Sequence, residues 1–320
     1  NPLGRILEQM MGGGSGYRGG GGGFGGGAGN PWGQILEEMM RGGQPGGGNS
    51  PILFFSRRIG LEKNEDGDQV PVPIVAGGRL TGRVGAYSIG LLNIQTDDHA
   101  ASPGTNFSVV RLRRNVLRRS NVGMIYTRRQ QTNGVGAAET LGVDGLYSPS
   151  SNFMVDTYYA RTRAPGVKGG DTSYSGSLSY TSDRYGVQAE HLYVGENFRP
   201  EVGFLRREDF RRSFAQLRFS PRPRPNHFRT VRRFVYGGNI EYFENSAGRV
   251  ETREVEGEAG VEFLSTDRFS LRLTRPYELV PEAFDPGGSK VTVPIGEYNY
   301  QSGQILYAMG TQHTLSGWLY

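Results

Sequence analysis

The sequence predicts an all-β fold, namely an antiparallel transmembrane β-barrel of about 14–16 strands, incompletely covered by the chain and preceded by a glycine-rich N-terminal leader. From Ile52 onward, apolar and polar residues alternate with the period of two that strands require. The connections between these segments alternate between long and short, as in outer-membrane barrels. No apolar run approaches the roughly 18–20 residues of a spanning helix, which excludes a helical membrane protein.

The leader, residues 1–50, contains two near-repeats that begin at Asn1-Pro2 and Asn30-Pro31 and end at Met11 and Met40. Each copy predicts a short helix, because Asn can cap the first turn, Pro fits the first helical position, and glycines end the run. Two interpretations stay open. The leader is either a flexible linker with two marginal helices, or a docking peptide for a periplasmic partner or for the barrel mouth.

The segment from Arg233 to Phe243 shows the alternation of residues 51–320 most clearly. Its apolar residues fall on one face of a strand and its polar residues on the other. The apolar set is Phe234, Tyr236, Ile240 and Tyr242, and the polar set is Arg233, Asn239 and Glu241. We therefore expect one face to contact lipid and the other to face a polar interior.

Fifteen strands are expected along residues 51–320. Their approximate ranges are 52–59, 74–83, 86–96, 105–115, 120–129, 137–147, 151–163, 171–181, 185–195, 210–219, 230–244, 249–263, 268–277, 297–309 and 313–320. Two connections break the long-short alternation, the proline-rich 220–229 and the tight 245–248. A soluble sandwich has no reason to sort its loops this way, so the barrel is favoured.

Charged residues on the polar face are the candidate functional residues. They would line the lumen, either merely solvating its wall or forming a selective pathway. They are Arg111, Arg113, Asp144, Asp156, Glu190, Arg218, Arg233, Glu241, Glu254, Glu256, Glu258 and Arg272. We expect the row of three glutamates, Glu254, Glu256 and Glu258, to pair mainly with Arg272 and Arg233.

Motifs for other chemistry are weak in this sequence. The four histidines are scattered, so no metal site is expected. Loop carboxylates at Asp66, Asp68, Asp97 and Asp98 are weak calcium candidates, with a solvated acidic loop as the alternative. We find no phosphate-binding loop and no nucleophile elbow, and therefore expect no catalytic residue and no cofactor. The glutamate row would suit glycoside chemistry, but packing in the lumen is the favoured role.

Composition narrows the location and the partners. The chain has 51 glycines and 36 % hydrophobic residues, a poor basis for a compact globule. The absence of cysteine fits an outer-membrane or periplasmic protein. A net charge of +5 would permit nucleic-acid binding, but the arginines are dispersed, so no nucleic-acid partner is expected.

Several stretches resemble the C-terminal outer-membrane barrel of the domain-of-unknown-function 5916 family. They are Ile52-Leu-Phe-Phe-Ser-Arg-Arg-Ile-Gly60, Gly77-Gly-Arg-Leu-Thr-Gly-Arg83, Ile89-Gly-Leu-Leu-Asn-Ile-Gln-Thr96, Asn197-Phe-Arg-Pro-Glu-Val-Gly-Phe-Leu-Arg-Arg207, Phe219-Ser-Pro-Arg-Pro223, Thr252-Arg-Glu254 and Val293-Pro-Ile-Gly-Glu-Tyr298. The resemblance covers Pro51 to the end and implies a barrel in the bacterial outer membrane. It also implies an N-terminal module similar to family 9 carbohydrate-binding domains, which this chain lacks, and hence carbohydrate as a partner of that module.

Three functions follow as expectations. The first is a scaffold or pore in the bacterial outer membrane, with lipid as its partner. The second is the barrel part of a glycan-binding or glycan-processing protein, and the third is a soluble all-β binding protein. An odd count of strands conflicts with the even numbers of bacterial barrels, so we expect a fragment that lacks at least one C-terminal strand and whose sheet stays open. With long loops outside the cell, the strand at Ile52 would place the leader in the periplasm.

Overall fold

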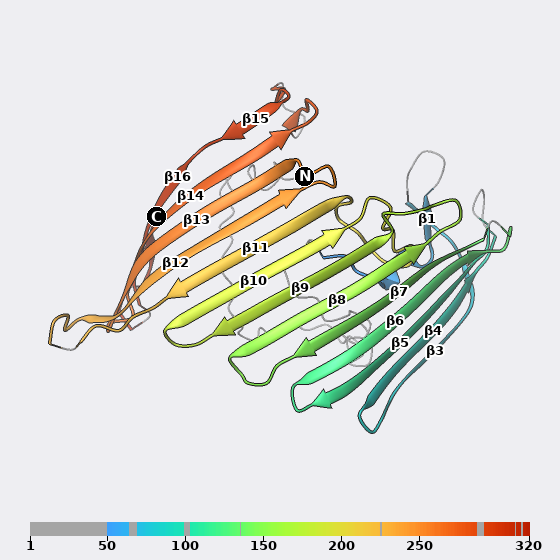
Figure 1. Ribbon diagram of the computed structural model, residues 1–320, viewed down its shortest axis with the longest axis horizontal. Coiled ribbons are helices and arrows are strands. Elements are labelled where there is room, and N and C mark those ends of the chain that lie inside the picture. The colour runs from blue at the N-terminus through green and yellow to red at the C-terminus, as the bar shows by residue number, and fades with distance from the viewer. Residues whose placement is uncertain are drawn as a thin grey trace.

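The computed structural model describes residues 50–63, 69–98, 103–134, 136–224, 226–286, 291–310, 312–314 and 316–320. The two leader repeats lie outside these residues. In the described part, fifteen strands form one antiparallel sheet (Figure 1). This confirms the predicted all-β class and the approximate number of strands.

The strands of the main sheet lie side by side in chain order, from β3 to β14 and then β16 and β17. Strand β15 also pairs with β14, on the same edge as β16. Their bounds are β3 Ile74–Val84, β4 Tyr87–Thr96, β5 Thr105–Leu117, β6 Ser120–Gln131, β7 Ala137–Tyr147, β8 Phe153–Arg163, β9 Thr172–Thr181, β10 Tyr185–Val194, β11 Phe210–Phe219, β12 Val231–Glu244, β13 Val250–Phe263, β14 Arg268–Val280, β15 Gly296–Asn299, β16 Ser302–Ala308 and β17 Trp318–Leu319. Every neighbouring pair is antiparallel, so hairpins connect the whole sheet.

The two rims of the sheet differ in the length of their connections. The short rim carries tight turns such as 85–86, 118–119 and 182–184, which form the lower edge in Figure 1. The long rim carries 97–104, 164–171, 195–209 and 281–295. The two expected exceptions are present, because residues 220–230 are long on the short rim and 245–249 are tight on the long rim. The predicted sorting of loops is confirmed.

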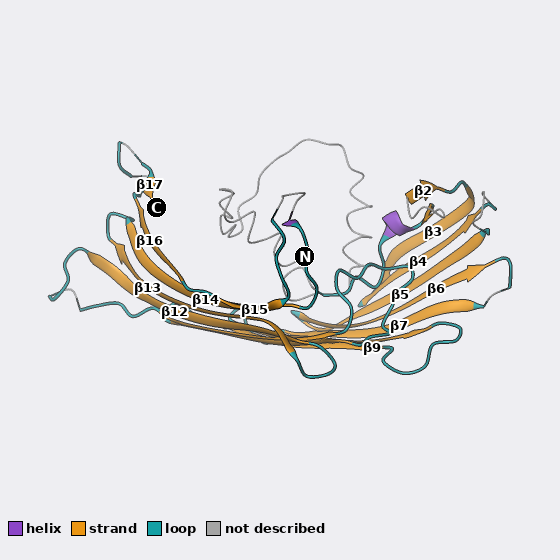
Figure 2. Cartoon of the chain, turned by 90° about the horizontal axis from the view of Figure 1, so that it is seen from above, coloured by secondary structure: helices purple, strands orange, loops and turns teal. Residues whose placement is uncertain are grey.

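The sheet curves into a trough, and Figure 2 shows the short 3-10 helix η1, Ser56–Arg58, and β2, Gln69–Pro71, on its hollow side. We call this side the concave face and the opposite side the convex face. Strand β2 pairs with β1, Leu61–Lys63, in a separate two-stranded sheet. In the described residues β3 pairs with β4 alone and β17 with β16 alone, so no ladder joins the two edges of the trough.

The expected strand at 52–59 is wrong. Residues 51–59 lie against the concave face instead, where Phe54 is buried together with Phe107 and Val109 of β5. Ile52-Leu53-Phe54-Phe55 is a continuous apolar run, and such a run indicates burial on both sides instead of one wall of a sheet. The orientation that we inferred from a strand at Ile52 loses its basis.

The last two expected strands are also corrected. The segment expected at 297–309 divides into β15 and β16, with Tyr300 and Gln301 between them. The break lies opposite Pro276 of β14, whose carbonyl accepts a hydrogen bond from the Tyr300 N–H at 3.4 Å. In an antiparallel pair a residue's N–H and C=O point to the same neighbour, so Pro276 offers no donor there and interrupts the ladder. The segment expected at 313–320 contributes only Trp318–Leu319.

Candidate functional site

All twelve charged residues singled out from the sequence share the concave face. The register shows this directly, because one row across the sheet contains Asp156 of β8, Glu190 of β10, Glu241 of β12 and Glu254 of β13, linked through Ser177 and Phe214. Arg218 lies in another row of the same face, through Gly237, Glu258 and Arg272. Whether this face encloses a lumen stays a prediction.

A buried ion pair between Arg111 of β5 and Asp144 of β7 occupies one end of the concave face. Both guanidinium Nη atoms donate to the carboxylate, with Nη2 and Oδ2 2.9 Å apart, and Arg111 is 2 % exposed. Gly123 of β6 lies between the two partners, and a Cβ there would be 2.7 Å from Arg111 Nη2. The glycine therefore leaves the space in which a bidentate pair can form across three strands.

A second buried cluster lies at the centre, where Arg212 of β11 bridges two carboxylates. Its Nη1 lies 2.7 Å from Glu190 Oε1, and its Nε lies 2.6 Å from Glu241 Oε1. The side chains of Arg212 and Glu190 are 7 % and 1 % exposed. Arg212 is not among the residues predicted from the sequence, although it shares the parity of Gln216 and Arg218 and therefore lies on the same face of the strand.

The glutamate row of β13 forms the third cluster. Arg272 of β14 contacts Glu256 at 3.4 Å and Glu258 at 3.2 Å, which confirms its predicted role as partner. Arg268 also reaches Glu258, at 2.6 Å. The predicted pairing of Arg233 with this row is wrong, because Arg233 contacts Glu262 at 2.5 Å.

The concave face also holds two apolar patches, and the chain folds back onto both. Leu53 packs against the first, around Phe107 and Ile125, and against the second, around Leu192 and Phe210. Residues 195–209, the β10–β11 connection, join this inner segment: Ile52 and Phe204 exchange two N–H···O bonds of 2.8 Å.

Close backbone approach at Gly203 permits this contact, since a Cβ there would overlap the carbonyl oxygen of Ile52. We call residues 51–55 and 198–205 together the inner plug. Its apolar side chains pack on the two apolar patches, so the concave face combines ion-pair clusters with a packed inner segment.

The remaining sequence candidates do not assemble into a site. Asp66 and Asp68 lie outside the described residues. Asp98 accepts hydrogen bonds from the Gly104 N–H at 2.5 Å and the Thr132 hydroxyl at 3.4 Å, and Asp97 accepts one from the Asp98 N–H, so these two carboxylates order their own loop. Within the described ranges no group of three acidic or histidine side chains suits a metal ion.

The convex face is mainly apolar, and the type of residue on it changes from the middle of the strands towards the two rims. Large apolar side chains lie exposed in the middle: Leu80, Leu91, Met124, Leu141, Val143, Leu178, Val187, Leu217, Ile240, Val255, Leu271, Leu273 and Ile305. Towards the short rim the same face carries Tyr87, Tyr147, Phe153, Tyr180, Tyr185, Phe219, Tyr236, Phe269 and Tyr307. Towards the long rim it carries Tyr126, Tyr159, Tyr174, Tyr193, Tyr242 and Tyr277. An apolar band thus lies between two rows of aromatic residues.

Aromatic contacts tie the short-rim row together across strands. Tyr185 stacks on Phe219 with ring centroids 5.4 Å apart, and Phe219 stacks on Tyr236 at 6.5 Å. On the long-rim side, Tyr174 and Tyr193 lie 5.1 Å apart. Cross-strand pairs of this kind stabilise a sheet from its surface.

No model of a known protein family matches the chain, and no curated protein sequence matches it. In the described part of the chain no helix has the length and apolar character to cross a membrane.

Proposed function

We propose that this chain forms the wall of a β-barrel in the bacterial outer membrane, where it acts as a scaffold or a pore. The observation that carries the proposal is the convex face, an apolar band between two aromatic rows. A soluble protein rarely exposes contiguous apolar area beyond a few hundred Å². A barrel wall needs such a band about 25 Å tall, with aromatic residues at both membrane interfaces.

The concave face supports the same proposal. Its arginines and carboxylates are paired across neighbouring strands, which suits a polar interior and would be costly against hydrocarbon. Closure of the trough is part of the proposal, because backbone groups at a sheet edge have no water to bind within a bilayer. The inner plug would then narrow the interior, so we expect little conductance from the protein as it stands.

Two neighbouring residues of β12 provide the test. Ile240 lies on the convex face, 42 % exposed, and Asn239 lies on the concave face, where its amide donates to Glu256 at 3.3 Å. Ile240→Arg should impair assembly into outer membranes, since an arginine on the lipid-facing side of the apolar band costs up to about 4 kcal/mol. Asn239→Arg, the matched control, should assemble because it adds a cation beside a glutamate.

Fractionation of cells, together with the gel shift of folded barrels between unheated and heated samples, measures both variants. Equal assembly of the two variants would contradict the proposed placement of the faces. Native, monomeric protein that stays soluble without detergent would contradict the membrane proposal itself.

A further inference from the structure

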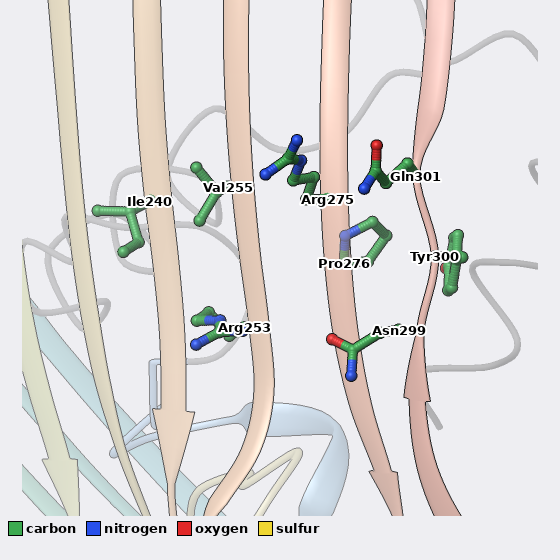
Figure 3. Close-up of a pocket in the computed structure, with 8 residues that line it drawn as sticks. All are labelled: Ile240, Arg253, Val255, Arg275, Pro276, Asn299, Tyr300 and Gln301. Carbon is green, nitrogen blue, oxygen red and sulfur yellow. The ribbon is translucent and has the colours of Figure 1, made fainter.

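The break in the sheet opposite Pro276 opens a hollow of about 500 Å³ on the convex face. Because Pro276 interrupts the ladder to β15 and β16, the wall is irregular at Tyr300 and Gln301. Figure 3 shows the residues that line it, which come from β12, β13, β14 and the segment from β15 to β16. The hollow therefore results from the interruption of the hydrogen-bonded ladder at Pro276.

The lining of this hollow combines two chemistries. Ile240 and Val255 form an apolar floor, and both are more than 40 % exposed. Arg253 and Arg275 supply cations, and Asn299 and Gln301 supply amides. An apolar floor beside clustered cationic and amide donors fits a ligand with a hydrocarbon part and an anionic part.

The position of Arg275 within the sheet makes the charge unusual. It continues a register row of the convex face that is apolar up to that point, through Leu178, Ala189, Ala215, Ile240 and Val255. Tyr277 follows it on β14 in the direction of the long rim. Arg275 thus lies in the apolar band next to the tyrosine row, and its long side chain can extend towards the level at which a membrane presents its headgroups.

The two arginines of the hollow also differ from others on the convex face near the long rim. Arg161 pairs with Asp171 at 2.9 Å, and Arg211 pairs with Glu244 at 3.4 Å. In the described part of the chain no acidic side chain pairs with Arg253 or Arg275, and Arg253 lies over the Tyr277 ring, 5.5 Å from its centroid. Two neighbouring cations without a carboxylate favour an external anion.

We propose that this hollow binds an anionic membrane lipid, with the headgroup phosphate between Arg253 and Arg275 and an acyl chain on Ile240 and Val255. This inference rests on the proposed membrane location. The phosphate would accept hydrogen bonds from both guanidinium groups and from the amides of Asn299 and Gln301. The acyl chain explains why the cations border an apolar floor.

The test uses the purified full chain in neutral detergent and native mass spectrometry with added phosphatidylglycerol, phosphatidylcholine or inorganic phosphate. Wild-type protein should bind one phosphatidylglycerol more tightly than phosphatidylcholine. The double variant Arg253→Gln/Arg275→Gln should weaken that affinity by tenfold or more, about the effect of losing one charge-assisted hydrogen bond. Arg161→Gln, the matched control, removes a convex-face arginine that already has a carboxylate partner and should leave the affinity unchanged.

Millimolar inorganic phosphate should not displace the lipid, because it cannot use the apolar floor. Displacement would mean that the hollow is a site for a free anion and would overturn the lipid assignment. Retention of the preference for phosphatidylglycerol in the double variant would also overturn it, while leaving the proposed function intact. Failure of the wild-type protein to enter lipid nanodiscs would instead contradict the proposed function, and the lipid site with it.

Discussion

Removal of the Arg212 guanidinium should destabilise the sheet more than the loss of any exposed ion pair. Arg212→Met keeps much of the side-chain volume but leaves Glu190 and Glu241, which now lie 2.7 and 2.6 Å from the guanidinium, without their shared cation. Loss of one partner from a buried pair costs about 3–5 kcal/mol. The Glu241 side chain is 25 % exposed, so water offsets part of its loss, and we expect about 3 kcal/mol.

Urea unfolding of the protein in lipid vesicles, followed by tryptophan fluorescence, measures this change. Arg161→Met is the matched control, because its side chain is 50 % exposed and its solvent-screened pair with Asp171 should contribute little to stability. Adding Glu190→Gln to Arg212→Met should recover part of the loss, since one stranded charge is removed. An unfolding free energy for Arg212→Met within 1 kcal/mol of that for the control would refute the assignment of a buried cluster.

Two further predictions concern the turns and the inner plug. Asp267 accepts hydrogen bonds from the Gly310 N–H at 2.7 Å and from His313 Nε2 at 2.8 Å, and these lower its pKa to about 2 from 3.8, the backbone bond having the largest effect. Because the pKa is lowered in the folded state, the stabilisation from the Asp267 carboxylate is fully present above pH 4 and is lost as the pH falls towards 2. The fluorescence of Trp318, measured in a Trp32→Phe background, should follow that transition. A transition that persists in Asp267→Asn would contradict this prediction. Gly203→Ala should displace residues 51–55, because its Cβ meets the Ile52 carbonyl oxygen, and it should raise both tryptic cleavage nearby and single-channel conductance. Gly257→Ala, which has open space around its Cβ, should change neither. Equal protection of the inner plug from trypsin in both variants would contradict this prediction.

The alternation of faces could be predicted from the sequence because it depends on neighbouring residues alone. Tyr174 and Ser175 illustrate this, the first exposed on the convex face and the second buried on the concave face. What the sequence could not show depends on other strands. The break after Asn299 is caused by Pro276 on β14, and no residue within 297–309 signals it.

The partners of individual charges were also predictable only in part. Arg272 was assigned correctly because regular pairing places it directly opposite Glu258. Arg233 was assigned wrongly because the ladder places it opposite Glu262, four residues along β13 from Glu258. The period-two pattern predicts the face of a residue but not its register against the next strand. The register shift between Val231 and Arg233 could not be predicted either, and beside it Arg232 also reaches Glu262.

Single-cysteine fluorescence in bilayers tests the central proposal, that the convex face contacts lipid, most directly. The chain has no cysteine, so each introduced thiol is the only one labelled. Leu217→Cys replaces a residue that is 63 % exposed on the convex face of β11, and Gln216→Cys replaces its neighbour on the concave face. With lipids that carry a quencher on the acyl chain, a dye at position 217 should be strongly quenched and a dye at position 216 should not. Equal quenching at both positions, or no quenching at position 217, would contradict the account.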